Sequence, residues 1–330
     1  MSAELKRTEF VFIYDIADAN PNGDPNDENR PRLDAETGRV KVTDVRLKRT
    51  VRDYLRDFRD KDIFCRQIEK DDGTIYEGKD RADDFYREIE REGKKAKNVV
   101  EKARLIEKSV IEKCIDVRLF GATIPVSIGE KGSSVTLTGP VQVAMGTTLH
   151  RVEPRFIKGT GAFASGQGKQ QKTFREEYVV PYALIAFYGI VNQQAAKSTG
   201  MTVEDAEALY EGIWYGTKNL ITRSKIGQRP LLLLLVEYNE PNAYIGRLDR
   251  FLEIRTKRAG QRDEEIRDAA ELILDTTKLV EALKAREGGI SRIRCAHDAR
   301  LEAKRLGVQE PMGEKDKWSA DLKVEDLNFL

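Results

Sequence analysis

The chain has 330 residues, of which 40% are hydrophobic and 34% are charged, so it can bury a sizeable core beneath a heavily charged surface. Its formal net charge is only +1, which excludes a uniformly basic protein and requires any nucleic-acid surface to come from locally clustered cations. The three cysteines are far apart in the sequence, and no apolar run approaches the ~20 residues that span a membrane. We therefore expect a cytoplasmic protein with free thiols and with no signal peptide or membrane segment.

The N-terminal part begins with an apolar, β-rich run at 10–16, which predicts a first strand. The next segment, 20–32, contains three prolines and four asparagines. These residues forbid a regular element there and favour Asx turns. Gly38 marks a hairpin turn, and a helix follows it with Thr43 or Asp44 as its N-cap.

The middle of the chain contains two long segments of unusual composition. Residues 59–113 are strongly charged and helix-forming, which predicts a helical insertion on a solvated surface. Residues 151–176 are polar, basic and glycine-rich, and they predict a long loop or hairpin. The remaining elements are predicted as strands at 134–144, 177–192, 231–238, 252–256 and 290–295, a helix from Thr202, and helices over 263–286. Single helices between strands, without a regular βαβα rhythm, favour an α+β fold over a doubly wound sheet.

The helix that begins near Asp44 has two contrasting faces. The apolar face, expected to pack on the sheet, consists of Leu47, Val51, Tyr54, Leu55 and Phe58. The opposite arc carries Lys48, Arg49, Arg52, Arg56 and Arg59. Like charges spaced i,i+4 cost a helix roughly 0.2–0.5 kcal/mol per pair, and a polyanion lying across the arc would reverse that cost. Charge patterning alone gives equal weight to the alternative, a basic face that is only solvated.

The segment from Pro154 to Arg175 contains no acidic residue, and its basic, aromatic and glycine residues alternate. Cations for phosphates and aromatic rings for bases are the two ingredients of single-strand binding. A dinucleotide motif and a Walker A motif are both nearly matched here. The first lacks its strand–turn–helix setting, and the second has Gln170 where Ser or Thr is required. Residues 222–229 form a third basic turn, for which simple solvation is the alternative.

Candidate catalytic and metal-binding groups are scarce. The sequence DANPNG at 18–23 begins like a calcium loop, but its twelfth position is Asn29, where a bidentate Glu is required. His150 and His297 lack ligands at metal-binding spacing, and no nucleophile elbow, HExxH or kinase motif is present. We expect no catalytic residue, no metal site and no cofactor, with an acid–base site outside the known motifs as the alternative.

Taken together, six motifs resemble the Cas-seven family, the backbone subunit of type I CRISPR Cascade complexes, with the type I-B branch closest and type I-C next. They are YDIADANPNGDPNDENRPRLD, VTDVRLKRTVRDYL, DVRLFGATIP, GPVQ, EEYVVPYALIAFYGIVN and SKIGQRPLLLLLVEY, and they cover most of residues 9–238. The resemblance implies an α+β fold with a ferredoxin-like (RRM-like) palm at 1–58 and 114–330. It also implies a helical finger insertion at 59–113 and a protruding thumb loop at about 151–176.

The resemblance further implies a non-catalytic CRISPR RNA-binding subunit in antiviral defence, which multimerises along the guide RNA and presents the spacer for pairing with target DNA. The implied partners are the guide RNA, target DNA, further copies of the chain and other Cascade subunits. The RNA-binding residues implied are Asn20, Asn22, Arg46, Lys48, Arg49, Arg52, Arg155, Phe156, Lys158, Lys169, Lys172, Arg223, Ser224 and Lys225. The usual RRM aromatics are absent, so base stacking on the sheet is not expected, and base pairing by the guide reads the sequence.

Two alternatives stay open. The first is a metal-dependent endoribonuclease of the type III backbone kind, which would cleave target RNA with an aspartate of an early loop. Asp24 and Asp34 lie in a comparable position. The second is a generic RNA-binding scaffold outside CRISPR.

Overall fold

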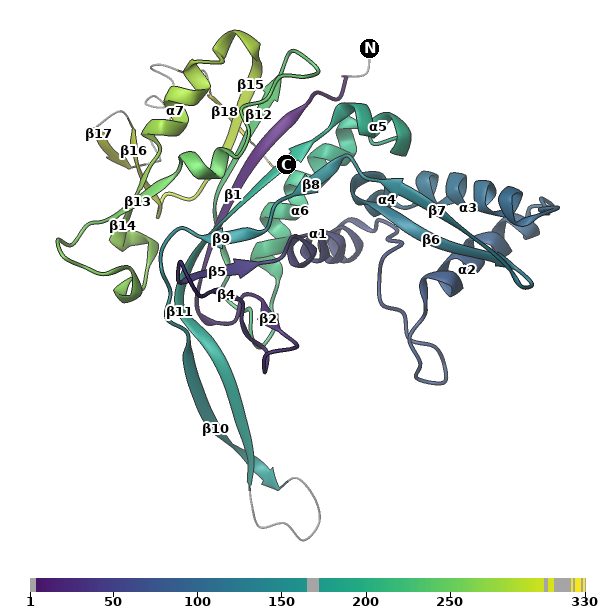
Figure 1. Ribbon diagram of the computed structural model, residues 1–330, viewed down its shortest axis with the longest axis horizontal. Coiled ribbons are helices and arrows are strands. Elements are labelled where there is room, and N and C mark those ends of the chain that lie inside the picture. Colours follow the sequence, from purple (N-terminus) through teal and green to yellow (C-terminus); the bar gives the residue numbers. More distant parts are fainter. Residues whose placement is uncertain are drawn as a thin grey trace.

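A computed structural model describes residues 4–164, 172–305, 308–311, 322, 324–327 and 329. It shows a mixed α+β fold around one large sheet (Figure 1), which confirms the fold class predicted at the coarse level. The α-helices are α1 (Asp44–Arg59), α2 (Gly78–Arg91), α3 (Val99–Lys113), α4 (Ile115–Phe120), α5 (Gln193–Thr199), α6 (Val203–Asn219) and α7 (Thr277–Lys284). No helix in these ranges is both long and apolar enough to cross a bilayer.

The strands of the first half are β1 (Thr8–Ala19), β2 (Gly23–Asp24), β3 (Arg30–Pro31), β4 (Leu33–Asp34), β5 (Arg39–Val42), β6 (Gly121–Ile128), β7 (Lys131–Thr138), β8 (Val141–Val143) and β9 (Gly146–Thr148). Those of the second half are β10 (Arg155–Ala164), β11 (Lys172–Val191), β12 (Arg229–Tyr238), β13 (Glu253–Thr256), β14 (Leu272–Asp275), β15 (Ile290–His297), β16 (Glu302–Arg305), β17 (Val308–Pro311) and β18 (Val324–Asp326). The main path of the ten-stranded sheet runs β18-β15-β12-β1-β11-β9-β5-β4, with β8 and β10 paired to β11 off this path.

Strand β1 is the centre of the sheet. It is antiparallel to β11 on one side and to β12 on the other, so its backbone is paired along both edges. Its first nine residues are buried, because both faces of the sheet are covered, and this explains why the strand is apolar almost continuously rather than alternating. The strand predicted at 10–16 is confirmed and extends to Thr8–Ala19.

Helices α1 and α6 cover one face of the sheet. Thr43 caps α1 by accepting a hydrogen bond from the backbone NH of Arg46, and Thr202 caps α6. A Cβ atom at Gly216 would lie only 3.0 Å from the backbone oxygen of Thr50, so glycine permits the close crossing of the two helices. The predicted apolar face of α1 is buried except at Phe58, which is 58% exposed. The expectation for Phe58 is wrong, because its ring stacks on that of Tyr54 with 5.2 Å between the centroids and leaves its other face in solvent.

The second face of the sheet is covered by α7 and a four-stranded sheet of order β13-β14-β16-β17. The prediction of helices over 263–286 holds for α7 but is wrong at β14, where LILD forms a fully buried strand. A short apolar run cannot be assigned to helix or strand by periodicity alone.

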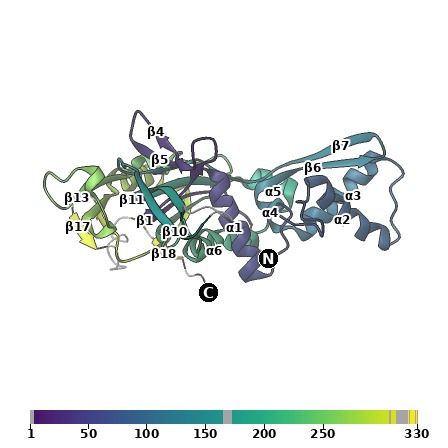
Figure 2. The same ribbon diagram turned by 90° about the horizontal axis from the view of Figure 1, so that it is seen from below.

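Helices α2 and α3 pack with the β6–β7 hairpin around a core of their own, which includes Phe85, Ile106 and Val126. The range predicted for the insertion, 59–113, contains both helices, while β6 and β7 complete their core. Figure 2 shows this unit extending sideways from the main sheet.

Asp116 joins the insertion to the main body. Its carboxylate is fully buried, accepts hydrogen bonds from the backbone NH groups of Phe64 and Cys65 at 2.8 and 3.0 Å, and pairs with Arg52 of α1 at 2.8 Å. The charge is therefore removed from water but bonded by three donors, which is the condition under which a buried ion is tolerated.

We expect Asp116→Ala to lower the free energy of unfolding by about 3–5 kcal/mol, because it leaves Arg52 and two backbone NH groups without their acceptor. Denaturant unfolding measures the loss. Asp57→Ala, which removes a half-exposed ion pair with Arg56, is the matched control and should cost under about 1 kcal/mol. Equal effects of the two substitutions would contradict the role assigned to Asp116.

Candidate nucleic-acid interface

Three segments that are distant in the sequence meet beside the N-terminus of α1. The backbone NH of Asn20 donates to the backbone oxygen of Ser224 at 3.0 Å. The Asn22 side-chain oxygen accepts from both the backbone NH and the hydroxyl of Thr43, at 2.8 and 2.9 Å. The loop after β1, the cap of α1 and the turn before β12 therefore form one surface. It contains five of the predicted site residues, which are Asn20, Asn22, Arg46, Ser224 and Lys225.

The cations of this surface are Arg46 and Lys225. Burial lowers the pKa of Lys225, and the nearby charge of Arg46 lowers it further. Burial likewise lowers the pKa of Arg46. In the described part of the chain neither side chain forms an ion pair. Two partly buried, mutually repelling cations are an arrangement that a bound anion would stabilise.

Two polar atoms of this surface are buried without a hydrogen-bond partner in the structure. They are the side-chain oxygen of Asn20 and the Nε of Arg46. The Asn20 side-chain nitrogen donates to the backbone oxygen of Asn29 at 2.7 Å, which fixes its oxygen as the unused acceptor. An unsatisfied buried polar group costs free energy, so a ligand that bonded the Asn20 oxygen and the Arg46 Nε would stabilise this surface.

The other cations of α1 are arranged differently from the sequence-based expectation. Each is paired with a carboxylate: Lys48 with Asp44 at 2.9 Å, Arg49 with Asp53 at 2.8 Å, Arg52 with Asp116 at 2.8 Å, Arg56 with Asp57 at 2.6 Å and Arg59 with Glu211 at 2.9 Å. The repulsion between like charges along the arc is thus already offset within the chain. Like-charge repulsion therefore no longer favours a polyanion on this arc, and RNA binding by Lys48, Arg49 and Arg52 stays a prediction. Lys48 and Arg52 also lie over the ring of Phe120.

The predicted basic loop forms the hairpin of β10 and β11, which extends away from the sheet (Figure 1). Near its base, Phe156 is 50% exposed and lies 5.0 Å from the ring of Tyr178. The guanidinium of Arg30 lies 4.5 Å from the centre of the same Tyr178 ring, so the loop after β1 reaches the hairpin. Arg155 and Lys158 of β10 are exposed, and Lys158 pairs with Glu176 at 3.1 Å.

The remaining predicted residues lie around these segments. Arg223 is 69% exposed and lies 4.0 Å from Glu177. Lys172 begins β11, and Lys169 lies outside the described residues. Sequence reasoning missed Arg30 and Tyr178, because neither belongs to a basic run. For Arg30, the arginines within the Asn/Pro loop at 20–32 were the sequence feature that could have indicated a binding residue.

Asp24 and Asp34, the candidates for cleavage, both stabilise turns. Asp24 pairs with Arg32 at 2.8 Å and accepts from the backbone NH of Asn26 at 3.1 Å. Asp34 accepts from the backbone NH groups of Thr37 and Glu36, and these hydrogen bonds lower its pKa. Throughout the described ranges, no three His, Cys, Asp or Glu side chains form a group that could hold a metal ion.

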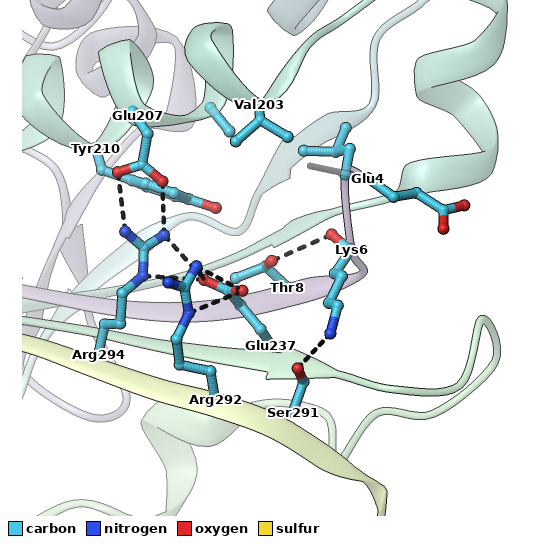
Figure 3. Close-up of a pocket in the computed structure, with 12 residues that line it drawn as sticks. Glu4, Lys6, Thr8, Val203, Glu207, Tyr210, Glu237, Ser291, Arg292 and Arg294 are labelled. Atoms are coloured by element: carbon cyan, nitrogen blue, oxygen red, sulfur yellow. Dashed lines mark hydrogen bonds and ion pairs between the residues drawn. The ribbon is translucent and has the colours of Figure 1, made fainter. Parts of the chain in front are cut away.

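A cavity of about 350 Å³ opens between the N-terminal segment, α6 and β15. Figure 3 shows that a chain of ion pairs lines it: Arg294 bridges Glu207 and Glu237, at 2.8 and 2.9 Å, and Arg292 pairs with the same Glu237 at 2.9 Å. The neighbouring Tyr210 has its pKa raised by burial. The acidic and basic side chains that line the cavity neutralise one another, so the cavity offers no surplus charge to a nucleic acid.

Comparison with solved structures shows which known proteins share this fold. The fold is similar to a chain of a CRISPR RNA-guided surveillance complex in a pre-nicking state, with a TM-score of 0.51, 14% identity, and coverage of 92% of this chain and 96% of that one. A chain of a second CRISPR RNA-guided surveillance complex gives a TM-score of 0.50 and 13% identity, with coverage of 96% and 94%. At these identities the likeness establishes a shared fold.

Sequence comparison then identifies the family. The family model described as CRISPR-associated protein Cas7 matches residues 6–277. The CRISPR-associated protein Cas7 of Haloferax volcanii is 32% identical over 324 residues, which cover 90% of this chain and 88% of that protein. The chain therefore belongs to the Cas7 family, and the resemblance inferred from the motifs is confirmed at that level.

We expect Asn22→Ala to lower the free energy of unfolding by about 1–2 kcal/mol, because the Thr43 NH and hydroxyl lose their shared acceptor. Asn22→Asp keeps an acceptor near the positive end of α1 and should restore most of the loss. Asn26→Ala, an exposed change in the same loop, is the control. Urea unfolding measures all three variants, and a loss for Asn26→Ala equal to that for Asn22→Ala would contradict the assignment.

Proposed function

We propose that the chain is the guide-RNA-binding backbone subunit of a type I Cascade interference complex, closest to the type I-B branch, acting in the cytoplasm. Copies assemble along one CRISPR RNA with other Cascade subunits and present its spacer for pairing with target DNA. The observation that carries this proposal is the surface of unpaired cations and unused polar atoms formed by Asn20, Arg46 and Lys225. Family membership and the fold shared with surveillance-complex chains support it.

The centre of the fold supports the assignment of an RRM-like palm. The chain order β1, α1, β9, β11, α6, β12 gives the spatial order β12-β1-β11-β9 with both helices on one face. This is the βαββαβ plan of ferredoxin-like domains. In this interpretation, the unit containing α2, α3, β6 and β7 is the finger, and the hairpin of β10 and β11 is the thumb.

The chemistry of the surface suits a ribonucleotide backbone. Arg46 and Lys225 supply positive charge for phosphate oxygens, and the free Nε of Arg46 supplies a directed donor. The Asn20 oxygen is an acceptor in the same place, where it would accept a hydrogen bond from a ribose 2′-hydroxyl. Phe156, at the base of the thumb, offers an exposed ring to an adjacent base. The palm thus holds the backbone, while base pairing supplies the sequence specificity.

The proposed role is non-catalytic. Asp24 and Asp34, on which the endoribonuclease alternative depends, are both engaged in ordering the turns of the early loop. Sequencing the RNA that co-purifies separates the proposal from a generic RNA-binding scaffold: repeat-derived guides support the proposal, and mixed cellular RNA contradicts it.

We expect Arg46→Ala and Lys225→Ala each to weaken guide-RNA binding by roughly tenfold, because each removes a charge-assisted contact. Each should also reduce the slope of log affinity against log salt by about 0.7, the value for one phosphate contact in a single strand. Fluorescence anisotropy over a salt series measures both quantities. Arg56→Ala, on the same helix but paired with Asp57, is the control, and binding unchanged by the first two substitutions would refute the interface.

We expect the purified chain to leave target RNA intact in the presence of Mg²⁺ or Mn²⁺. Denaturing gels of labelled target RNA, annealed to the guide, provide the measurement. Metal-dependent cleavage that is abolished by Asp24→Ala or Asp34→Ala would instead establish the endoribonuclease alternative.

A further inference from the structure

The outer end of the insertion carries an apolar groove. A cavity of about 720 Å³ opens between the start of α3 and the turn that joins β6 to β7. Val100 is 53% exposed and Ile128 is 40% exposed at its edges. Large apolar side chains left exposed together in a solvated unit mark an interaction surface rather than a core.

The groove also carries a surplus of positive charge. Lys97, Arg104 and Lys131 line it and are exposed, and the structure pairs none of them with a carboxylate among the residues that it describes. The acidic side chain at the rim, Glu101, is already engaged by the backbone NH of Lys97 at 2.7 Å. The occupant that fits this groove is therefore an apolar side chain flanked by carboxylates.

The same insertion presents such a feature in the tight turn 69–75 that leads into α2. An antiparallel bridge joins Glu69 to Ile75, and the backbone NH of Lys70 donates to Thr74 at 2.7 Å. Ile75 is 55% exposed. Lys70 folds back onto Asp80 at 2.8 Å, so the charge that remains at the turn is negative.

Two carboxylates flank the exposed isoleucine. Glu69 and Asp71 are exposed, and within the described ranges neither forms an ion pair. The start of α3 and the β6–β7 turn, which line the groove, lie at the outer end of the insertion in Figure 1, whereas the turn at 69–75 lies below α2. One chain thus carries both an acidic apolar knob, residues 69–75, and a basic apolar groove.

We propose that the knob of one copy docks into the groove of the next copy. Ile75 then covers Val100 and Ile128, and the carboxylates of Glu69 and Asp71 meet the three unpaired cations. Because the two surfaces differ, the contact is head-to-tail and propagates as an open filament rather than closing into a dimer. The inference rests on the proposed assembly of copies along one RNA, and it adds a protein–protein contact between neighbouring insertions.

A disulfide cross-link tests the contact. Full-length Ile75→Cys and Val100→Cys chains, both carrying Cys65→Ser to remove the exposed native thiol, are assembled together on a guide RNA and oxidised. We expect a cross-linked dimer from the mixture and none from either variant alone. Tyr244→Cys, exposed on the main body, replaces Val100→Cys in the control and should give no dimer with Ile75→Cys.

The outcomes separate the two proposals. Copies that assemble on the RNA by mass photometry but give no 75–100 dimer would overturn the contact and leave the proposed function standing. Copies that do not assemble on the RNA would overturn both. In a purified multisubunit complex, cross-linking of the cysteine at 100 to a different subunit would assign the groove to that subunit and overturn self-docking.

Charge reversal tests the electrostatic part of the contact. Lys131→Glu in the groove-bearing copy should lower the yield of the 75–100 dimer roughly fivefold, and Asp71→Lys in the knob-bearing copy should restore it. A dimer yield unaffected by Lys131→Glu would show that these charges do not contribute to the contact.

Discussion

The register of β1 against its two neighbours is the constraint on which the rest of the structure depends. Because β1 is antiparallel to both strands, its C-terminal end lies beside the start of β12 and beside the middle of β11, with Asp15 opposite Arg229 and Ala19 opposite Val180. The Asp15 carboxylate is fully buried and pairs with the Arg229 guanidinium, whose Nε lies 2.9 Å from it. A slip of one residue would turn the apolar side chains of both faces the wrong way. The same register brings together the loop after β1, the turn before β12 and the base of the hairpin.

The distinction between paired and unpaired cations matters more here than their number. The arc of α1 looks like a phosphate-binding stripe in the sequence, yet its charges are neutralised by carboxylates of α1, α4 and α6. Arg46 and Lys225 come from different elements and lie close together without such partners. A nearly neutral chain can therefore hold a polyanion if a few cations are left unpaired at one place, and copies of the chain can approach one another without general repulsion.

The insertion likewise combines a buried, paired charge with exposed, unpaired ones. Its core is built by α2, α3, β6 and β7, and the buried Asp116 attaches it firmly to α1. This attachment fixes where the knob at 69–75 and the groove at the outer end lie relative to the proposed RNA-binding surface. Under the proposed function, the spacing of copies along the RNA is then determined by contacts between proteins as well as by the thumb.

The sequence by itself determined the family, the class of fold and most of the elements. Continuous apolar runs predicted β1, β11 and β12, Thr43 and Thr202 marked the helix starts, and the polar, basic, glycine-rich segment at 151–176 predicted a long loop or hairpin, because these signals depend on neighbouring residues in the chain. Ion pairing could not be predicted in this way. Whether Arg52 faces solvent or Asp116, and whether Lys225 lies beside Arg46, depends on residues far apart in the sequence that only tertiary packing brings within a few ångströms. The buried strand at β14, the exposure of Phe58 and the unused oxygen of Asn20 were likewise decided by packing, since burial is a property of the folded whole and not of a local pattern.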